Sequence, residues 1–558
     1  MVQRMHRQII RILEKGYGVF FGAACLVLAL FCFYHLDVKY VDSWDEARHG
    51  VNAYEMLENG NFIQHTYNYE VDTWNLKPPL SYWGILLGFG MFGCSVFGLR
   101  FYSALCYLLT GIVTGLWVGK RSRVGGILVL GFFCANTLPL YAHLARAGDA
   151  DSLYLMLFTF AMLSMLELSK NKKYLYVCGL CFSLAFLTKS WHAGMLVAIG
   201  GLFLLVTGEI RRIKWKEWGL FLLSIFLPLA LWFGWRYGAD GLMFFRQMIE
   251  VDLLARTGTA NFEGHSGPVS FYWEMVFGNT AYIYPWVLGV CVLGGLALLV
   301  YLIAQRNRSA GAKNVVQERD KDETNGISER TAGEGIPDNT SSSLLWQYGW
   351  GLGLWFGVVF FGFSLMKTKL IWYCYPAIVP VFVLAALILG KCIGWDGGEP
   401  GEESGEIQEN HTKTVKNWKN QILPGMQLLL IVGCVVVVLH FMKGAYETAI
   451  RDVHGDGFQD FLKLSASQDS AYAGWDAYIQ VPGEKPEQLG DWDQNRLFLA
   501  EISGNFRCKD GGVVAFLQAG PGCVIYLDRE NYAAFAEELW DCEVLYLNEG
   551  YPYVVLGR

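Results

Sequence analysis

The chain has 558 residues, of which 53% are hydrophobic, 15% aromatic and 17% charged, and its formal net charge at pH 7 is −7. A soluble domain usually carries about 25% charged residues. The apolar residues here are also gathered in blocks of roughly 18–24, the length that crosses a hydrocarbon core about 30 Å thick. These features exclude a soluble globular protein, predict a multi-pass membrane protein, and give no reason to expect a nucleic-acid partner.

Eleven apolar blocks are predicted to span the membrane as helices. They lie at about residues 17–35, 98–118, 124–142, 150–169, 174–189, 191–208, 218–237, 284–304, 346–366, 371–390 and 424–441. Lys and Arg residues are concentrated before the first block and after the second, fourth and sixth blocks. Because short basic connections mark the cytoplasmic side, we expect the N-terminus in the cytoplasm and the segment after the last block outside.

The polar segments between the blocks differ in character. Residues 305–344 and 395–420 are rich in charged residues, Gly and Ser, so they are predicted to be flexible cytoplasmic loops without a site. Residues 36–97 form the first outer segment and residues 442–558 the last. The chain is therefore expected to divide into a membrane module, residues 1–441, and an outer domain.

Residues 442–558 are predicted to form a small α/β domain. The apolar and β-branched residues of GVVAFLQA, GCVIYLDR, CEVLYLNEG and YPYVVLGR predict strands, and YAAFAEELW predicts a helix between two of them. A segment of about 115 residues is long enough to bury a core of its own.

Ionisable residues beside the apolar blocks gather on the predicted outer side. They are Asp45, Glu46, Arg48, His49 and Lys77 in the first outer segment, Arg146, Asp149, Asp151 and Lys189 at helix junctions, and Arg256, His265, Lys367 and Lys369 in later connections. Ionisable groups at membrane depth are costly and indicate function. A transporter is expected to carry them near the midplane, so this one-sided distribution favours an enzyme that acts on the headgroup of an amphiphile.

The segment DSWDEARHGVNAYEMLENG, in the first outer segment, predicts a helix. Ser43 and Glu46 have the spacing of a capping box, so Glu46 is either a helix cap or a site residue. Asp45 is either a first-turn carboxylate favoured by the helix dipole or a catalytic base. Helical spacing places Asp45, Arg48 and His49 on one face.

The segment WNLKPPLSYW follows. Pro78 and Pro79 favour an extended stretch and then the start of a second, amphipathic helix that lies along the membrane surface. Lys77 is expected at the start of that helix. It is either a ligand for a phosphate or an interfacial lysine whose ammonium reaches the water.

Two short motifs flank the fourth and fifth blocks. LARAGDADSLYLMLF begins the fourth block with Asp149 and Asp151, one of which is interpreted as an N-cap. The motif LTKS places Lys189 on a tight outer turn. A lysine in such a turn gains nothing by extending its side chain toward the water, so this common reason for a lysine beside a membrane helix does not apply.

Two further segments carry candidates. KTKLIWYCYP places Lys369 beside Trp372 and Tyr373, and these aromatic residues are interpreted as membrane-interface anchors rather than a sugar-stacking surface. His265, in EGHSGP, is either a ligand or an ordinary loop histidine.

Together these motifs resemble the GT-C membrane glycosyltransferases, and are most similar to glycosyltransferase family 39 and the bacterial lipid A aminoarabinose transferases. The resemblance rests on Asp45-Glu46-Ala47-Arg48, on Lys77-Pro78-Pro79-Leu80, and on ARAGDAD, LTKS, H-x-G-P and K-x-K-L-x-W-Y in the expected order. It covers about residues 36–390. It implies a polytopic α-helical GT-C fold with about 11–13 transmembrane helices and outer juxtamembrane helices.

The family implies inverting transfer of a sugar from a polyprenyl-phosphate donor to a lipid, protein or glycan acceptor on the outer face of the cell membrane. Carried over to this sequence, Asp45 is the general base and Glu46 and Asp151 are further catalytic carboxylates. The donor phosphate is assigned to Lys77, assisted by Arg48, Lys189 or Lys369. The secondary or acceptor-side candidates are Asp149, Arg146, His265 and Arg256.

One departure from the family concerns a metal. Aminoarabinose transferases place a metal-binding glutamate directly before the Lys-Pro-Pro motif, and this chain has Leu76 there. The carboxylates and His265 still leave a divalent metal open as a cofactor.

Two other functions compete with transfer. A flippase for a lipid-linked sugar is the alternative, but it predicts ionisable groups deep in the spans and an internal repeat, and we find neither in the sequence. A sensor or scaffold leaves the residues of the first outer segment unexplained.

Overall fold

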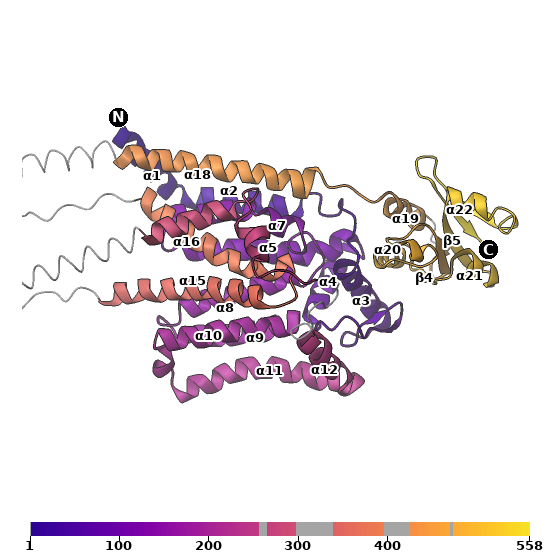
Figure 1. The fold of residues 1–558 in the computed structure, drawn as a ribbon, viewed down its shortest axis with the longest axis horizontal. Helices are drawn as coiled ribbons and strands as arrows, with labels where there is room; N and C mark the ends of the chain where they lie inside the picture. Colours follow the sequence, from indigo (N-terminus) through magenta and orange to yellow (C-terminus); the bar gives the residue numbers. More distant parts are fainter. Residues whose placement is uncertain (1, 256–264, 297–338, 395–422, 469–471) are drawn as a thin grey trace, which may run out of the picture.

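The protein is described by a computed structural model over residues 2–255, 265–296, 339–394, 423–468 and 472–558. Long helices lie side by side along the long axis of the molecule, and a small domain with a β-sheet stands at one end of this bundle (Figure 1). The N-terminus lies at the opposite end of the bundle. The predicted polytopic helical fold with a small C-terminal α/β domain is confirmed.

The elements have the following bounds. The α-helices are α1 (Val2–Lys15), α2 (Tyr17–Phe33), α3 (Asp45–Asn59), α4 (Leu80–Phe92), α5 (Val96–Gly119), α6 (Arg123–Cys134), α7 (Thr137–Tyr141), α8 (Asp151–Leu166), α9 (Lys173–Lys189), α10 (Gly194–Val206), α11 (Trp215–Asp240), α12 (Met243–Gln247), α15 (Asn339–Leu365), α16 (Tyr375–Ile393), α18 (Leu423–Tyr446), α19 (Gly457–Gln468), α20 (Gln494–Gly504), α21 (Gly512–Gln518) and α22 (Arg529–Ala534). The strands are β1 (Thr66–Tyr67), β2 (Glu70–Val71), β3 (Asp476–Gln480), β4 (Arg507–Cys508), β5 (Cys523–Asp528), β6 (Glu543–Leu547) and β7 (Tyr553–Gly557).

The predicted spans coincide with helices in the described residues. Six helical stretches there are long and apolar enough to cross a membrane, and α1 and α2 pass the same test as a pair bent by 72°. The remaining blocks fall on the shorter apolar helices α6, α8 and Tyr284–Leu296. The predicted block at 284–304 is described only as far as Leu296. The predicted loops at 305–344 and 395–420 lie outside the described residues, apart from the start of α15.

Two predicted helical boundaries can be compared directly. The turn predicted between the fifth and sixth blocks is present: α9 ends at Lys189, and Lys172 before α9 pairs with Glu209 after α10, so the two helices form a hairpin. The span predicted at 124–142 is broken between α6 and α7, where the side-chain amide of Asn136 bonds to the hydroxyls of Tyr107 and Tyr284.

The amphipathic character predicted for α4 is wrong. Its sequence LSYWGILLGFGMF is apolar on all sides, and the helix packs closely on α5. A Cβ on Gly88 would lie 2.0 Å from the carbonyl oxygen of Gly98, and one on Gly84 would lie 2.6 Å from the ring of Tyr102. These glycines let the two helix backbones approach, as small residues do in membrane helix pairs.

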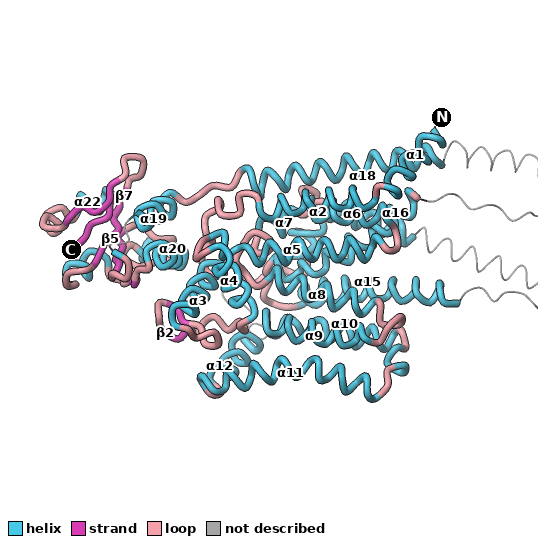
Figure 2. Tube along the Cα trace, turned by 180° about the vertical axis from the view of Figure 1, so that it is seen from behind, coloured by secondary structure: helices cyan, strands magenta, loops and turns pink. Residues whose placement is uncertain are grey.

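The C-terminal domain contains a five-stranded sheet of order β4-β3-β5-β7-β6. Strand β3 is parallel to β4 and β5, whereas β7 is antiparallel to β5 and β6. Figure 2 shows the strands of this sheet in magenta at the end of the molecule away from the N-terminus. The strand predicted from GVVAFLQA is wrong, because this segment forms helix α21. Val513 and Phe516, three positions apart, are buried, while Val514 is 63% exposed, which is the helical period of three to four residues rather than the alternation of a strand.

The C-terminal domain shares a hydrophobic core with the first outer segment. Helix α20 packs on α3, and Phe498 of α20 lies against Gly50 of α3 and stacks with Phe89 of α4 at 6.5 Å between ring centroids. A second apolar cluster, which includes Phe516 and Ile525, lies within the domain itself. The domain thus has its own core and is also fixed to the helix that begins with Asp45.

Candidate active site

Helix α3 begins at Asp45 with an unusual preceding residue. Trp44 has φ +65° and ψ −102°, and it makes no side-chain cap bond. The capping box predicted from Ser43 and Glu46 is wrong, because the hydroxyl of Ser43 has no hydrogen-bond partner among the residues that the structure describes. Asp45 therefore enters the helix as its first residue, and its carboxylate lies beside Lys77.

Glu46 is buried and paired with Arg100 of α5. Its carboxylate accepts bonds from Arg100 Nε at 2.6 Å and Nη2 at 2.9 Å, and from the backbone N–H groups of Asp42 and Gly148. Such a fully satisfied buried pair fixes the geometry around it. In this arrangement Glu46 positions α3 and does not face the cavity described below. The sequence signal for this pair was Arg100 itself, a charged residue at the start of an apolar block.

Asp45 and Lys77 form the centre of the site. Lys77 Nζ lies 3.0 Å from Asp45 Oδ1 and 3.9 Å from Asp149 Oδ1. Asp45 and Lys77 are half-buried, whereas Asp149 is buried. Residues 32 positions apart in the sequence thus meet as the resemblance implies.

The loop that carries Lys77 is held by Asp72. This buried carboxylate accepts bonds from Arg48 Nε and Nη2, both at 2.8 Å, and from the backbone N–H groups of Trp74 and Asn75. The sequence predicts that Asp45, Arg48 and His49 share one face of the helix. In the structure the guanidinium of Arg48 bonds to Asp72 and so to the loop that carries Lys77.

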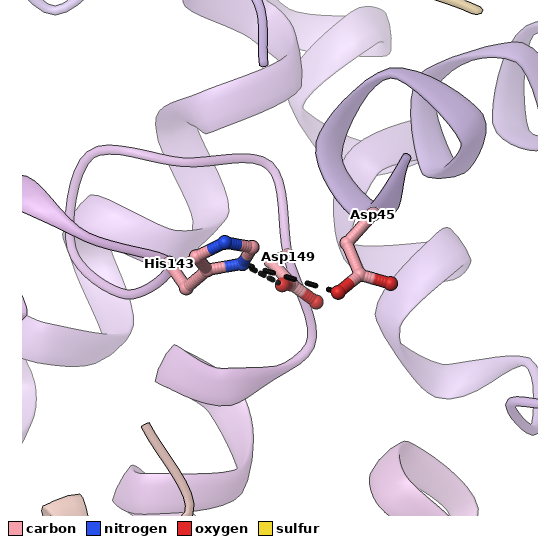
Figure 3. Close-up of side chains that lie close together, drawn as sticks. All are labelled: Asp45, His143 and Asp149. Atoms are coloured by element: carbon pink, nitrogen blue, oxygen red, sulfur yellow. Dashed lines mark hydrogen bonds and ion pairs between the residues drawn. The ribbon is translucent and has the colours of Figure 1, made fainter. Parts of the chain in front are cut away.

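His143 joins Asp45 and Asp149 in a compact cluster (Figure 3). His143 Nδ1 lies 3.0 Å from Asp149 Oδ2 and 4.0 Å from Asp45 Oδ2. Its ring stacks on Trp372 at 3.7 Å between centroids. His143 was missed from the sequence, where it precedes the ARAGDAD motif as an isolated histidine in a polar junction.

The charges of the cluster support one another. Burial opposes the ionisation of Asp45 and Asp149, but the ammonium of Lys77 and the imidazole of His143 outweigh it, so the pKa of Asp45 is lowered and that of Asp149 is lowered well below its usual range. Burial disfavours the charged form of His143, but its bond to Asp149 raises the pKa of the imidazole above its ordinary value. Asp45 is therefore ionised at neutral pH and beside cations.

His49 is fully buried behind Asp45. Its Nδ1 lies 2.5 Å from the backbone carbonyl oxygen of Asp45, and its Nε2 has no hydrogen-bond partner among the described residues. Burial, together with the charge of Lys77, lowers the pKa of His49 to about 4. His49 is thus a neutral ring that supports the start of α3.

Asp151 and Lys189 form a second ion pair beside the first. Both are buried, and their charged atoms are in direct contact. Asp151 is the first residue of α8 and makes no cap bond, and the turn before it is held by Asp149 and Ala150. The N-cap predicted for one of Asp149 and Asp151 is therefore wrong, and both carboxylates face charged partners instead.

One cavity of about 870 Å³ connects these groups. The residues that line it are Ser43, Trp44, Asp45, Thr73, Trp74, Asn75, Leu76, Lys77, His143, Asp151, Lys189, Ser190, His192, Val251, Asp252, His265, Leu370, Trp372 and Tyr373. The predicted candidates Asp45, Lys77, Asp151, Lys189 and His265 are thus brought together. Trp372 and Tyr373 line the cavity as well, which disfavours their interpretation as membrane anchors alone.

Two other candidates cap helix ends. Arg146 donates to the carbonyl oxygens of Phe31, Tyr34 and His35 at the end of α2. Lys369 Nζ donates to the carbonyl oxygens of Ser364 and Met366 at the end of α15. Cations in this position satisfy the last carbonyls of a helix, so we assign both a structural role. Arg256 lies outside the described residues.

The residues present fit a divalent cation at one place. Asp45, His143 and Asp149 offer three ligand atoms within 4.8 Å of one another, a carboxylate–imidazole set of the kind that metals use. A cation held there would supply Lewis acidity beside the reacting groups. Lys77 already brings a positive charge to the same carboxylates.

The helical bundle, with α3 and α4 and a small domain at one end, has the fold of solved structures of the bacterial protein ArnT. Over 97% of this chain and 98% of the other, the structure matches that of ArnT from Cupriavidus metallidurans bound to undecaprenyl phosphate, with a TM-score of 0.59 and 16% sequence identity. The apo structure of the same ArnT matches over the same shares of both chains with a TM-score of 0.56.

Sequence comparison agrees with the fold. Residues 76–235 match the family of dolichyl-phosphate-mannose-protein mannosyltransferases. An uncharacterized protein of Aquifex aeolicus is 30% identical over 38% of this chain and 42% of its own length. The undecaprenyl phosphate-alpha-4-amino-4-deoxy-L-arabinose arabinosyl transferase 2 of Pseudomonas fluorescens is 28% identical over 34% of this chain and 33% of its own length. The chain thus spans less than half the length of these two relatives, and the predicted resemblance is confirmed.

Proposed function

We propose that this protein transfers a sugar from a polyprenyl-phosphate donor to a hydroxyl acceptor on the outer face of the cell membrane. The observation that carries the proposal is the Asp45–Lys77 pair, 3.0 Å apart, in a cavity that also holds the Asp151–Lys189 pair. A base beside a cation is what a displacement at a sugar phosphate needs. The fold, shared with a protein bound to undecaprenyl phosphate, supports the choice of donor.

In the proposed reaction Asp45 acts as the general base. The acceptor hydroxyl gives its proton to the Asp45 carboxylate, and its oxygen forms a bond to the anomeric carbon of the sugar. The bond from that carbon to the phosphate oxygen breaks on the opposite side, which inverts the configuration. The leaving polyprenyl phosphate carries the electron pair and is stabilised by the ammonium of Lys77.

The neighbouring groups keep Asp45 and Lys77 charged and in position for this reaction. His143 and Asp149 hold Asp45 and Lys77 in charge balance. Lys189 adds a second cation for the phosphate, and Asp151 orients it. Preorganised charges of this kind cost no rearrangement during the reaction.

The test is donor turnover by Asp45→Asn. Purified protein in nanodiscs is offered a panel of polyprenyl-phosphate sugars, and released polyprenyl phosphate is measured with and without EDTA. We expect release to fall by roughly 10³-fold or more in Asp45→Asn, as for loss of a catalytic base with its electrostatic partner, and to be unchanged in the matched control Asp37→Asn, an exposed aspartate of the same segment. Equal turnover by Asp45→Asn overturns the proposal. A donor that binds without release by the unmodified protein, with acceptor present, supports a flippase instead.

A further inference from the structure

Two tryptophan rings stand at the mouth of the cavity. Trp44 and Trp74 both line it, yet their exposed fractions are 47% and 42%. Their ring centroids are 6.0 Å apart with an angle of 45° between the planes. Large exposed aromatic surfaces beside a site indicate a binding partner, because an indole offers an apolar face with little conformational freedom to lose.

The backbone of Trp44 is strained where its ring reaches the mouth. Its φ of +65° and ψ of −102° lie in a region that glycine adopts readily and a bulky residue does not. The residue is followed directly by Asp45, so the strain sets the ring beside the proposed base. Strain of this kind persists at sites where it contributes to function.

Trp74 is held in place by charged neighbours. Its backbone N–H donates to Asp72 Oδ1 at 2.9 Å, and the guanidinium of Arg48, itself bound to Asp72, lies 4.8 Å from the centroid of its ring. A ring fixed before binding loses little freedom when a ligand arrives. These neighbours fix the ring of Trp74 at the cavity that it lines.

The C-terminal domain reaches the same mouth. The ammonium of Lys485, in the loop after β3, lies 5.6 Å from the ring centroid of Trp44. The aromatic pair therefore lies where the first outer segment meets the C-terminal domain. A ligand on these rings also meets the C-terminal domain.

We propose that Trp44 and Trp74 form a carbohydrate-binding surface for the acceptor, so that the acceptor is a saccharide whose hydroxyl is presented to Asp45. A pyranose ring has an apolar C–H face that packs on an indole and a rim of hydroxyl groups that bond to polar side chains. The inference rests on the proposed function and adds the class of acceptor. A hydroxyl of a polypeptide has no such ring to stack.

The test measures saccharide binding independently of transfer. The full-length Asp45→Asn protein, in nanodiscs of phosphatidylethanolamine and phosphatidylglycerol, is titrated with soluble oligosaccharides by saturation-transfer NMR. A second arm offers the same sugars as glycolipids in the nanodisc, which separates a free glycan from a lipid headgroup as the source. Because binding is read without turnover, failure here is distinct from failure of donor release.

The decisive variants are Trp44→Gly and Trp74→Leu in the same background. Trp44→Gly removes the ring and the backbone strain together, so we expect an unchanged or higher unfolding temperature and at least about tenfold weaker saccharide binding. Trp74→Leu is expected to weaken binding by about the same factor. The control Trp540→Ala changes a tryptophan that is 82% exposed in the C-terminal domain, and binding should not change. No saccharide binding in either arm, or equal loss in Trp540→Ala, overturns the inference.

Discussion

At the scale of single residues, the ionisation of Asp45 depends on its neighbours. Lys77 and His143 each place a positive charge near its carboxylate, and Asp149 places a negative one. The balance lowers the pKa of Asp45, so the proposed base is charged at neutral pH. A pH profile should therefore report the cluster rather than one residue.

The substitution His143→Asn removes a positive charge from the cluster. In the unmodified protein the bond to Asp149 raises the pKa of the His143 imidazole. Without this charge the carboxylates of Asp45 and Asp149 are less favoured, so their pKa values rise and the acid limb of the rate profile moves to higher pH. We expect a shift of about one unit for one lost neighbouring charge, measured as donor release between pH 4 and 9. The unmodified protein should also lose rate as pH rises through the pKa of His143, and His143→Asn should lack this limb. Superimposable profiles contradict the prediction.

At the scale of elements, helix α3 carries the proposed base and is fixed by α20. Gly50 is the contact point, since a Cβ there would lie 2.6 Å from the ring of the buried Phe498. The position of Asp45 therefore depends on a domain that is distant in the sequence.

Gly50→Ala should separate α3 from α20. We expect a loss of about 1–3 kcal/mol of stability, as for overpacking, together with faster proteolysis of the C-terminal domain and slower donor release. Gly90→Ala is the matched control, because no atom of the described residues outside its own helix turn lies within 4 Å of the added Cβ. Adding Phe498→Leu to Gly50→Ala should restore the packing. If Gly50→Ala has the same stability and the same rate of donor release as Gly90→Ala, Gly50 is not the contact that fixes α3 to α20.

The same contact contains a buried carboxyl group. Glu501 of α20 is fully buried beside Glu55 of α3. Burial, and then the charges of Glu55 and Glu58, raise the pKa of Glu501 well above its usual value. The folded protein thus keeps a proton that the unfolded chain releases above about pH 4.5, and stability falls as pH rises from there toward the folded pKa.

Glu501→Gln should remove this pH dependence. The slope for one such group is at most about 1.4 kcal/mol per pH unit, so the unmodified protein should have a lower unfolding temperature at pH 8 than at pH 5.5, and the variant a smaller difference. Glu487→Gln, an exposed glutamate of the same domain, serves as the control. An unchanged difference in Glu501→Gln shows that the carboxyl group is not protonated in the folded state.

At the scale of the whole molecule, the two ends of the bundle differ in chemistry. The end near the N-terminus carries the basic connections, where Arg121 pairs with Glu167 and Lys172 with Glu209. The opposite end carries the cavity, α3 and the C-terminal domain (Figure 1).

Reporter fusions test the orientation that follows from these charges. We expect a green fluorescent protein fused before α1 to fluoresce, because it stays in the cytoplasm, and alkaline phosphatase fused after β7 to be active, because it is exported. Phosphatase fused after Lys172, in a basic connection, should be inactive. An inactive C-terminal fusion of intact length contradicts the orientation.

Much of the fold follows from the sequence because membrane helices depend on local properties. The length and hydropathy of a block define a span, and the described parts of the eleven predicted blocks fall on helices. The sequence also indicates Asp45, Lys77, Asp151 and Lys189 as candidates, since charged residues are conspicuous beside apolar blocks, and the structure places all four around one cavity. Two predictions that rested on weak local signals were wrong. The valines of α21 are typical of a strand, although the segment forms a helix, and α4 lacks the polar face expected of a surface helix.

What only the tertiary structure decided is which side chain meets which. The sequence determined the spans and the side on which charges gather, because both follow from the cost of placing polar groups in hydrocarbon. It did not determine that Glu46 belongs to Arg100, that His143 joins Asp45, or that Trp74 stands beside Trp44. These pairs are separated by 30 to 98 positions in the sequence. They are fixed by helix packing and by the docking of α20 on α3, which no short window of sequence contains.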